Sequence, residues 1–147
     1  MERRSLSMPL LSRKGLLAIA AVIDVAQHGA GRPVSAKILA ARHSLPARHL
    51  EPVLQELVRM GILKGIRGPR GGYELAKERR RITADDILRA AGSIEDSDDT
   101  VRPGSALLTT VVIPAVSQAE RAFSVALNRI NLDELVRMAE PLRDMSI

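Results

Sequence analysis

The stretch LEPVLQELVRMGILKGIRGPRGGYEL, residues 50–75, decides the fold. Its first part carries apolar residues at three- and four-residue spacing, which is typical of an amphipathic helix, and this helix is expected to end at Gly61. Two short apolar runs follow, over residues 62–66 and 72–75, and the glycine-rich turn between them predicts a β-hairpin with a longer loop. The stretch therefore predicts a helix that leads directly into a two-stranded hairpin.

Two more helices are expected before this stretch. Ser12 is placed to cap a helix that runs to about His28, and Ser35 is placed to cap a short helix that follows it. Pro46 suits the first position of the third helix, whereas Pro52 removes a backbone hydrogen bond inside it and predicts a kink or a later start. Helix, short helix, turn, helix and hairpin, in that order, predict a winged helix-turn-helix in a mainly α-helical chain.

The loop of the expected hairpin could be either a phosphate-binding loop of an enzyme or a tip that contacts nucleic acid. A Walker-type phosphate loop needs a Lys-Ser/Thr pair after its glycines and a strand-to-helix context, and neither is present here. Glycines instead permit positive φ and a thin tip. We expect Arg67 and Arg70 to reach phosphates or a narrow minor groove. Four neighbours are expected to shape the tip rather than bind: Gly68, Pro69, Gly71 and Gly72.

The charge distribution points to a polyanionic partner. The chain has 147 residues and a formal net charge of +5. Residues 1–90 carry 17 basic against 8 acidic side chains, whereas residues 91–147 carry 5 against 9. A basic front joined to an acidic back indicates that one part of the chain meets a polyanion and the other does not. One Tyr, one Phe and no Trp argue against a platform that stacks single-stranded bases.

Several functional classes find no support in the sequence. The absence of cysteine excludes disulfides, zinc–thiolate sites and thiolate-held iron–sulfur clusters. Neither a nucleophile–base–orienter set nor a glycine-rich cofactor turn is present, so we expect no catalytic residues, no enzyme activity and no cofactor. The three histidines, His28, His43 and His49, are scattered over three expected elements, and we expect no metal site. No transmembrane segment or clear signal peptide is found, so we expect a cytoplasmic protein without a membrane partner.

A long apolar stripe dominates the second half of the chain. After an acidic loop over residues 93–104, apolar residues recur at i, i+1, i+4, i+5 spacing and predict a long helix that Pro114 splits or bends. A last helix over residues 131–141 is expected to begin with Asn131 as its cap and Glu134 three residues later. The stripe would form a large apolar patch on a monomer.

The chain resembles the IscR/NsrR/CymR-type winged helix-turn-helix regulators of bacteria, the Rrf2 family. The resemblance covers roughly residues 8–138 and rests on five motifs: HLEPVL (49–54), GIL (61–63), RGPRGGYEL (67–75), ITADDILRA (82–90) and INLDEL (130–135). It implies a homodimer that binds a pseudo-palindromic operator in double-stranded DNA. The dimer would be held by residues of the stripe: Leu108, Val112, Val116, Ala119, Phe123 and Leu127. Many members hold an iron–sulfur cluster through three cysteines, which this chain lacks.

We therefore expect a sequence-specific, dimeric transcriptional regulator that acts as a repressor. Its expected parts are a DNA-binding domain (8–92), the acidic loop (93–104), and a region with the dimerisation helix and a C-terminal helix (105–147). Base contacts are expected from the second motif helix through Arg48, His49 and Glu51. Phosphate contacts are expected from Lys64, Arg42, Arg13 and Lys14. Two alternatives stay open: a winged-helix module that binds protein, and a regulator that responds to an unidentified small molecule or protein effector.

Overall fold

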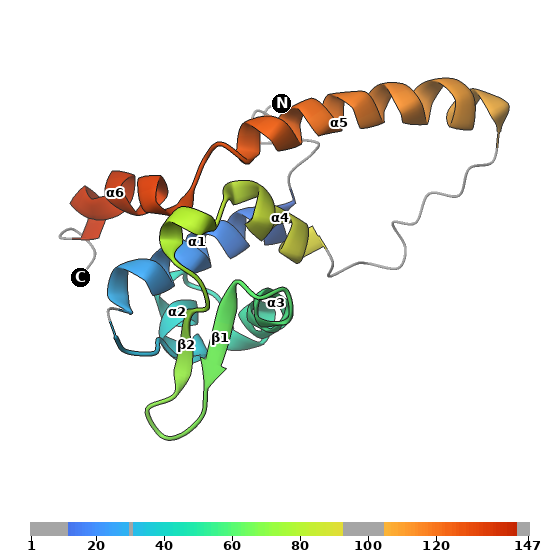
Figure 1. Ribbon diagram of the computed structural model, residues 1–147. Helices are drawn as coiled ribbons and strands as arrows, with labels where there is room; N and C mark the ends of the chain where they lie inside the picture. The colour runs from blue at the N-terminus through green and yellow to red at the C-terminus, as the bar shows by residue number, and fades with distance from the viewer. Residues whose placement is uncertain (1–11, 30, 93–104, 144–147) are drawn as a thin grey trace.

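The computed structural model describes residues 12–29, 31–92 and 105–143, which form a helical domain with a protruding hairpin and a long outlying helix (Figure 1). Three helices come first: α1 (Arg13–His28), α2 (Ala36–Arg42) and α3 (Ala47–Arg59). An antiparallel hairpin follows, built from β1 (Leu63–Ile66) and β2 (Gly72–Leu75). The remaining elements are the 3-10 turn η2 (Arg79–Arg81), α4 (Ala84–Gly92), the π-helical turn η4 (Leu108–Val112), α5 (Ile113–Leu127) and α6 (Leu132–Arg143). The predicted winged helix-turn-helix in a mainly helical chain is confirmed.

Side-chain caps start the first two helices where the sequence predicts them. The hydroxyl of Ser12 accepts a hydrogen bond from the Gly15 amide at 2.9 Å, and that of Ser35 accepts from the Ile38 amide at 3.1 Å. Each cap satisfies one amide that the helix itself leaves without a partner and contributes about 1 kcal/mol. The starts of α1 and α2 thus follow from local sequence.

The starts of α4 and α6 are capped reciprocally and lie side by side. Thr83 and Asp86 exchange two backbone-to-side-chain bonds, of 3.0 and 3.1 Å, and Asn131 and Glu134 do the same at 3.3 and 3.0 Å. Thr83 and Asn131 also form an isolated antiparallel bridge. This bridge fixes the start of the last helix against the start of α4.

The prolines at the start of α3, within α3 and at the start of α5 have different consequences. Pro46 is the N-cap of α3 rather than its first residue, and α3 continues through the exposed Pro52, so the delayed start does not occur. Before Pro114, the amide of Ile113 bonds to the carbonyl of Leu108, five residues back, in a π-helical turn. A proline ring clashes with the carbonyl four residues earlier, and the wider π turn relieves this clash. The chain therefore continues from η4 into α5 without a break.

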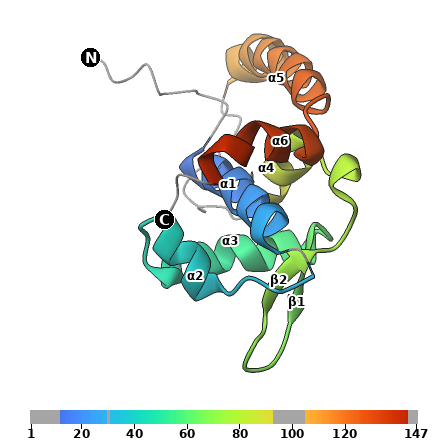
Figure 2. The same cartoon turned by 90° about the vertical axis from the view of Figure 1, so that its left-hand side faces the viewer.

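The apolar core lies between α1, α2, α3, β1, α4 and α6. Its largest fully buried side chains are Leu39, Leu50, Leu54, Leu57, Ile62, Leu63, Ile82, Ile87, Leu132, Val22, Val25 and Val53. In Figure 2, α2, α3 and the hairpin lie on one side of α1, and α5 and α6 lie on the other. The described helix α5 contributes no buried residue, so it stands outside this core. Among the described helices, none combines the length and the apolar character that a membrane crossing requires.

Candidate nucleic-acid interface

The hairpin is a wing with two exposed arginines at its tip. Arg67 and Arg70 are both exposed, and neither takes part in an ion pair with another described residue. The amide of Gly71 donates to the carbonyl of Gly68 at 2.9 Å, which closes a tight turn with Pro69 and Arg70 at its centre. The tip therefore presents two uncommitted guanidinium groups. Figures 1 and 2 show the hairpin protruding from the helices.

The three tip glycines are required for two different reasons. Gly68 has φ +116°, a conformation that side-chain-bearing residues rarely adopt. A Cβ on Gly71 would lie 2.2 Å from the Ile66 carbonyl oxygen, and one on Gly72 would lie 2.5 Å from the Val34 carbonyl. Positive φ thus explains Gly68, whereas close approach of backbone to backbone explains Gly71 and Gly72.

The base of the wing is fixed to the domain through Tyr73. Its backbone exchanges hydrogen bonds of 2.9 and 2.8 Å with Val34, so the segment before α2 extends the hairpin by one bridge. The Tyr73 side chain is half-buried and packs against the core. Burial raises the pKa of the Tyr73 phenol above its usual range, and the negative charge of Glu51 on α3 adds to the shift. The base of the wing therefore lies within electrostatic reach of Glu51 on α3.

The outward face of α3 carries the residues expected to contact bases. Arg48, His49 and Glu51 are all exposed on its first turns. The opposite face is buried through Leu50, Val53, Leu54 and Leu57. Their spacing of three and four residues sets which side chains point outward.

One polar residue on this outward face was missed by the sequence analysis. Gln55 is exposed and lies four residues after Glu51, so the two share the outward face. A glutamine amide can pair with both the acceptor and the donor that adenine shows in the major groove. The helical spacing from Arg48 and Glu51 was the signal that could have found it.

Basic residues from α1 join the start of α3 around a groove. Arg13 and Lys14 line it from the first turn of α1, and Arg48 and His49 line it from α3. The groove has a volume of about 770 Å³. Four of the expected contact residues are thus gathered on one side of the domain.

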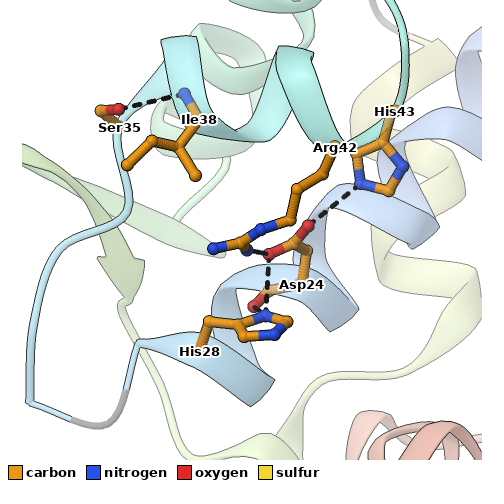
Figure 3. Close-up of polar contacts among 6 residues, drawn as sticks. All are labelled: Asp24, His28, Ser35, Ile38, Arg42 and His43. Carbon is orange, nitrogen blue, oxygen red and sulfur yellow. Dashed lines mark hydrogen bonds and ion pairs between the residues drawn. The ribbon is translucent and has the colours of Figure 1, made fainter. Parts of the chain in front are cut away.

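The other two expected phosphate contacts have partners within the protein. Lys64 on β1 lies 3.7 Å from the carboxylate of its register partner Glu74 on β2. Arg42 points to Asp24 and forms an ion pair with its Oδ1 atom (Figure 3). The structure thus gives both residues an intramolecular role, and their contacts with DNA stay a prediction.

Three cationic or titratable side chains contact Asp24 at the junction of α1 and α2 (Figure 3). Its side chain is 7% exposed, His28 Nδ1 lies 3.1 Å from Oδ1, and His43 Nε2 lies 3.2 Å from Oδ2. Two histidines that look scattered in the sequence therefore meet Arg42 at one carboxylate. The signal was a single aspartate in the otherwise apolar run over residues 15–26, with a histidine four residues later.

The predicted dimerisation residues are divided between two surroundings. Val112, Val116 and Ala119 are exposed, as are Leu107 at 65% and Val111 at 54%. The other three are half-buried: Leu108, Phe123 and Leu127. Phe123 and Leu127 line a cavity of about 370 Å³ that α5 forms with α4 of the same chain. The exposed apolar face is therefore concentrated in η4 and the first half of α5.

A winged helix-turn-helix with exposed arginines on the wing and polar residues on the second motif helix defines a DNA-binding regulator. The model of the Rrf2 family, described as an iron-dependent transcriptional regulator, matches residues 11–138. The chain belongs to this family. It is a DNA-binding transcriptional regulator and not an enzyme.

Named relatives and solved structures agree with this assignment. The HTH-type transcriptional regulator IscR of Pectobacterium atrosepticum is 31% identical over 137 residues, which cover 90% of this chain and 82% of the relative. Protein rrf2 of Nitratidesulfovibrio vulgaris is 30% identical over 80% of this chain and 81% of its own length. The structure of T. potens IscR matches with a TM-score of 0.69 at 30% identity, over 92% of this chain and 90% of that one. CymR, the global cysteine regulator of B. subtilis, matches with a TM-score of 0.65 at 27% identity, over 87% and 96%.

The family description mentions iron, but this chain has no thiolate that could bind it. The sequence contains no cysteine, so a cysteine-held iron–sulfur cluster does not fit it. Across residues 12–29, 31–92 and 105–143, no group of three or more His, Asp or Glu side chains is arranged to hold a metal ion.

Proposed function

We propose that the protein is a homodimeric repressor that binds a pseudo-palindromic operator in double-stranded DNA without an iron–sulfur cluster. The observation that carries this proposal is the exposed apolar face of η4 and α5. Val116 is 50% exposed and Leu107 is 65% exposed, although both are large aliphatic residues. Contiguous apolar surface of this kind marks an interaction site. Its occupant in the proposal is a second copy of the chain.

A two-fold dimer explains the form of the operator. When the same face of each copy meets the other, the two DNA-binding domains are related by a two-fold axis. Each half then presents one α3 and one wing to one half-site, and the operator repeats with inverted symmetry. The proposed division of the chain follows: residues 8–92 bind DNA, and 105–147 hold the dimer, with the acidic loop (93–104), which lies outside the described residues, between them.

Within each half-site, we assign separate roles to α3 and the wing. Arg48, His49 and Glu51 would read base edges in the major groove, because they are exposed on the face of α3 away from the core. Arg67 and Arg70 would contact phosphates or the adjacent minor groove from the wing tip. Phosphate contacts would come from Arg13 and Lys14 beside α3, and from Lys64 and Arg42 if their internal ion pairs open.

Repression is the proposed direction of regulation. Blocking a promoter requires only tight, sequence-specific binding by a dimer, and these are the two capacities that the wing, α3 and α5 support. A target on chromosomal DNA also implies that the protein works in the cytoplasm.

Selection of bound genomic fragments tests this proposal. The purified protein is incubated with fragmented DNA at about 150 mM salt, which suppresses much nonspecific attraction. We expect enrichment of an inverted repeat, and lower expression of a reporter that carries this repeat in its promoter. Enrichment of single, unrepeated sites would contradict the dimer, and higher reporter expression would contradict repression. The matched control is the Arg32→Ala, Lys37→Ala variant, which removes two exposed charges outside the proposed contact set.

A further inference from the structure

The groove between α1 and α3 has an apolar floor and a basic rim. Leu17, Leu45 and Val53 line the floor, and Arg13, Arg48 and His49 line the rim. Its volume of about 770 Å³ falls within the range of roughly 300–1,000 Å³ that is typical of small-molecule sites. One groove thus combines both kinds of surface.

Charge selects the kind of ligand. The groove takes cationic groups from α1 and α3 and, among the residues that the structure describes, no carboxylate lines it. Arg13, Arg48 and His49 form no ion pair within the described ranges. Neighbouring cationic groups add to the attraction for an anion, and arginine binds a carboxylate through two parallel hydrogen bonds.

DNA alone does not account for the floor. A phosphodiester backbone needs basic groups and hydrogen-bond donors but no apolar surface beneath them. We infer that the groove binds a small organic anion, a carboxylate on an apolar body, with the apolar body on Leu17, Leu45 and Val53 and the carboxylate at Arg13 and Arg48. The ligand chemistry follows from what the two surfaces complement.

The groove is held open by contacts behind it. His43 lines one side and its Nε2 atom lies 3.2 Å from Asp24 Oδ2, so this wall is tied to α1. Pro46 caps α3 without a side-chain hydrogen bond, and its carbonyl accepts from the His49 amide at 3.0 Å. The start of α3 beside the groove is therefore held by a backbone hydrogen bond.

The site would make DNA binding responsive to the ligand, and this consequence rests on the proposed function. Arg48 and His49 line the groove and are also the proposed base contacts, so ligand and operator would exclude one another. The apparent operator affinity should then fall by the factor one plus the ratio of ligand concentration to its dissociation constant.

The first test is direct binding of decanoate without DNA, followed through labelled leucine and valine methyl groups by NMR. We expect chemical-shift changes at the methyl groups of Leu45 and Val53. The dissociation constant of the uncharged analogue decanamide should be at least about tenfold larger than that of decanoate, because the amide lacks the ionic contact. Shift changes confined to the α5 valines, equal affinity for decanamide, or no binding would each overturn the inference. The last result would leave the groove to another part of this chain or to a second copy.

Variants at Leu45 locate the site and separate the two proposals. Leu45→Glu places a negative charge in the groove and should weaken decanoate binding at least about tenfold relative to Leu45→Gln, which changes polarity without charge. Equal affinities of the two variants would overturn the site. In the wild-type protein, decanoate should displace operator DNA in proportion to its own occupancy. Decanoate binding without any operator binding would overturn the proposed function but not the proposed ligand site. Operator binding without decanoate binding would overturn the ligand site but not the proposed function.

Discussion

Ser124 on α5 donates a 2.6 Å hydrogen bond to Oδ1 of Asp85 on α4. The other oxygen of this carboxylate accepts from Arg89 Nε at 2.8 Å, and the Asp85 residue is only 7% exposed. The bond joins residues that lie 39 positions apart and anchors the second half of α5 to the DNA-binding domain. In Figure 1, the first half of α5 extends past α4, so the anchor lies near the domain and the free apolar face lies beyond it.

Ser124→Ala should destabilise the protein, because it leaves one oxygen of a buried carboxylate without its donor. A buried polar group that loses its partner costs about 1–3 kcal/mol. The free energy of unfolding, measured by urea denaturation, should fall by that amount. Ser117→Ala is the control on the same helix, since Ser117 makes no side-chain hydrogen bond in the described part of the chain. Coincident transitions of the two variants would show that the anchor contributes nothing.

Asp24→Asn should also destabilise the domain. The substitution keeps the shape of the side chain but removes the charge that holds Arg42 and faces His28 and His43. Because Arg42 and both histidines keep some access to water, we expect a loss of about 1–3 kcal/mol rather than the larger loss that follows removal of a fully buried partner. Urea denaturation measures it. Arg59→Gln, which removes the exposed partner of Glu56, should leave the free energy of unfolding nearly unchanged, and a similar loss in both variants would refute the structural role of Asp24.

The wing assignment predicts the behaviour of the Arg67→Ala, Arg70→Ala double variant. Each base contact removed should weaken operator binding by about 1–3 kcal/mol, and each phosphate contact removed should reduce the salt slope by about one. Fluorescence anisotropy over a series of salt concentrations distinguishes the two. The Arg32→Ala, Lys37→Ala variant controls for the loss of two positive charges. If affinity and slope in the wing variant match the wild type, the wing does not bind DNA.

Val116→Glu tests the proposed dimer face. A carboxylate in the centre of an apolar contact would be buried without a partner, so the dimer should dissociate and operator affinity should fall with it. Sedimentation velocity measures the oligomeric state directly. Gln118→Glu introduces the same charge two positions along α5 and should leave the sedimentation coefficient unchanged. A dimer that survives Val116→Glu places the interface elsewhere.

Local sequence patterns predicted the secondary structure but not the contacts between residues far apart in the sequence. The caps at Ser12, Ser35 and Asn131 follow from short-range hydrogen-bond chemistry, and each is confirmed. The hairpin follows from glycine placement between two apolar runs. The bonds from Asp24 to Arg42 and from Asp85 to Ser124 span 18 and 39 residues, and no periodicity encodes them. The sequence could place the wing and α3, but it could not show that Arg42 is already engaged.

The response to the second internal proline was only partly predictable. Pro114 was expected to split or bend its helix, since proline removes an amide and clashes with a preceding carbonyl. The chain adopts the π-helical turn η4, which accommodates the ring, so the helix is not split.

Tyr73 offers a spectroscopic test of the coupling between the wing and α3, because it is the chain's only tyrosine. Burial, and secondarily Glu51, raises its pKa above the usual 10.0. The folded state therefore holds the phenol proton more tightly than the unfolded state. The resulting stability is fully present below pH 10.0 and is lost as pH rises through the folded pKa. Titration of phenolate absorbance should give a midpoint above that of the denatured chain.

Glu51→Gln should lower this midpoint without returning it to the denatured value, because burial is the larger of the two causes. Glu74→Gln is the matched control: Glu74 is next to Tyr73 in sequence but is paired with Lys64, so its removal should leave the midpoint in place. If Glu74→Gln moved the midpoint and Glu51→Gln did not, the charge on β2 rather than that on α3 would govern Tyr73. The base of the wing would then be electrostatically independent of the helix proposed to read the operator.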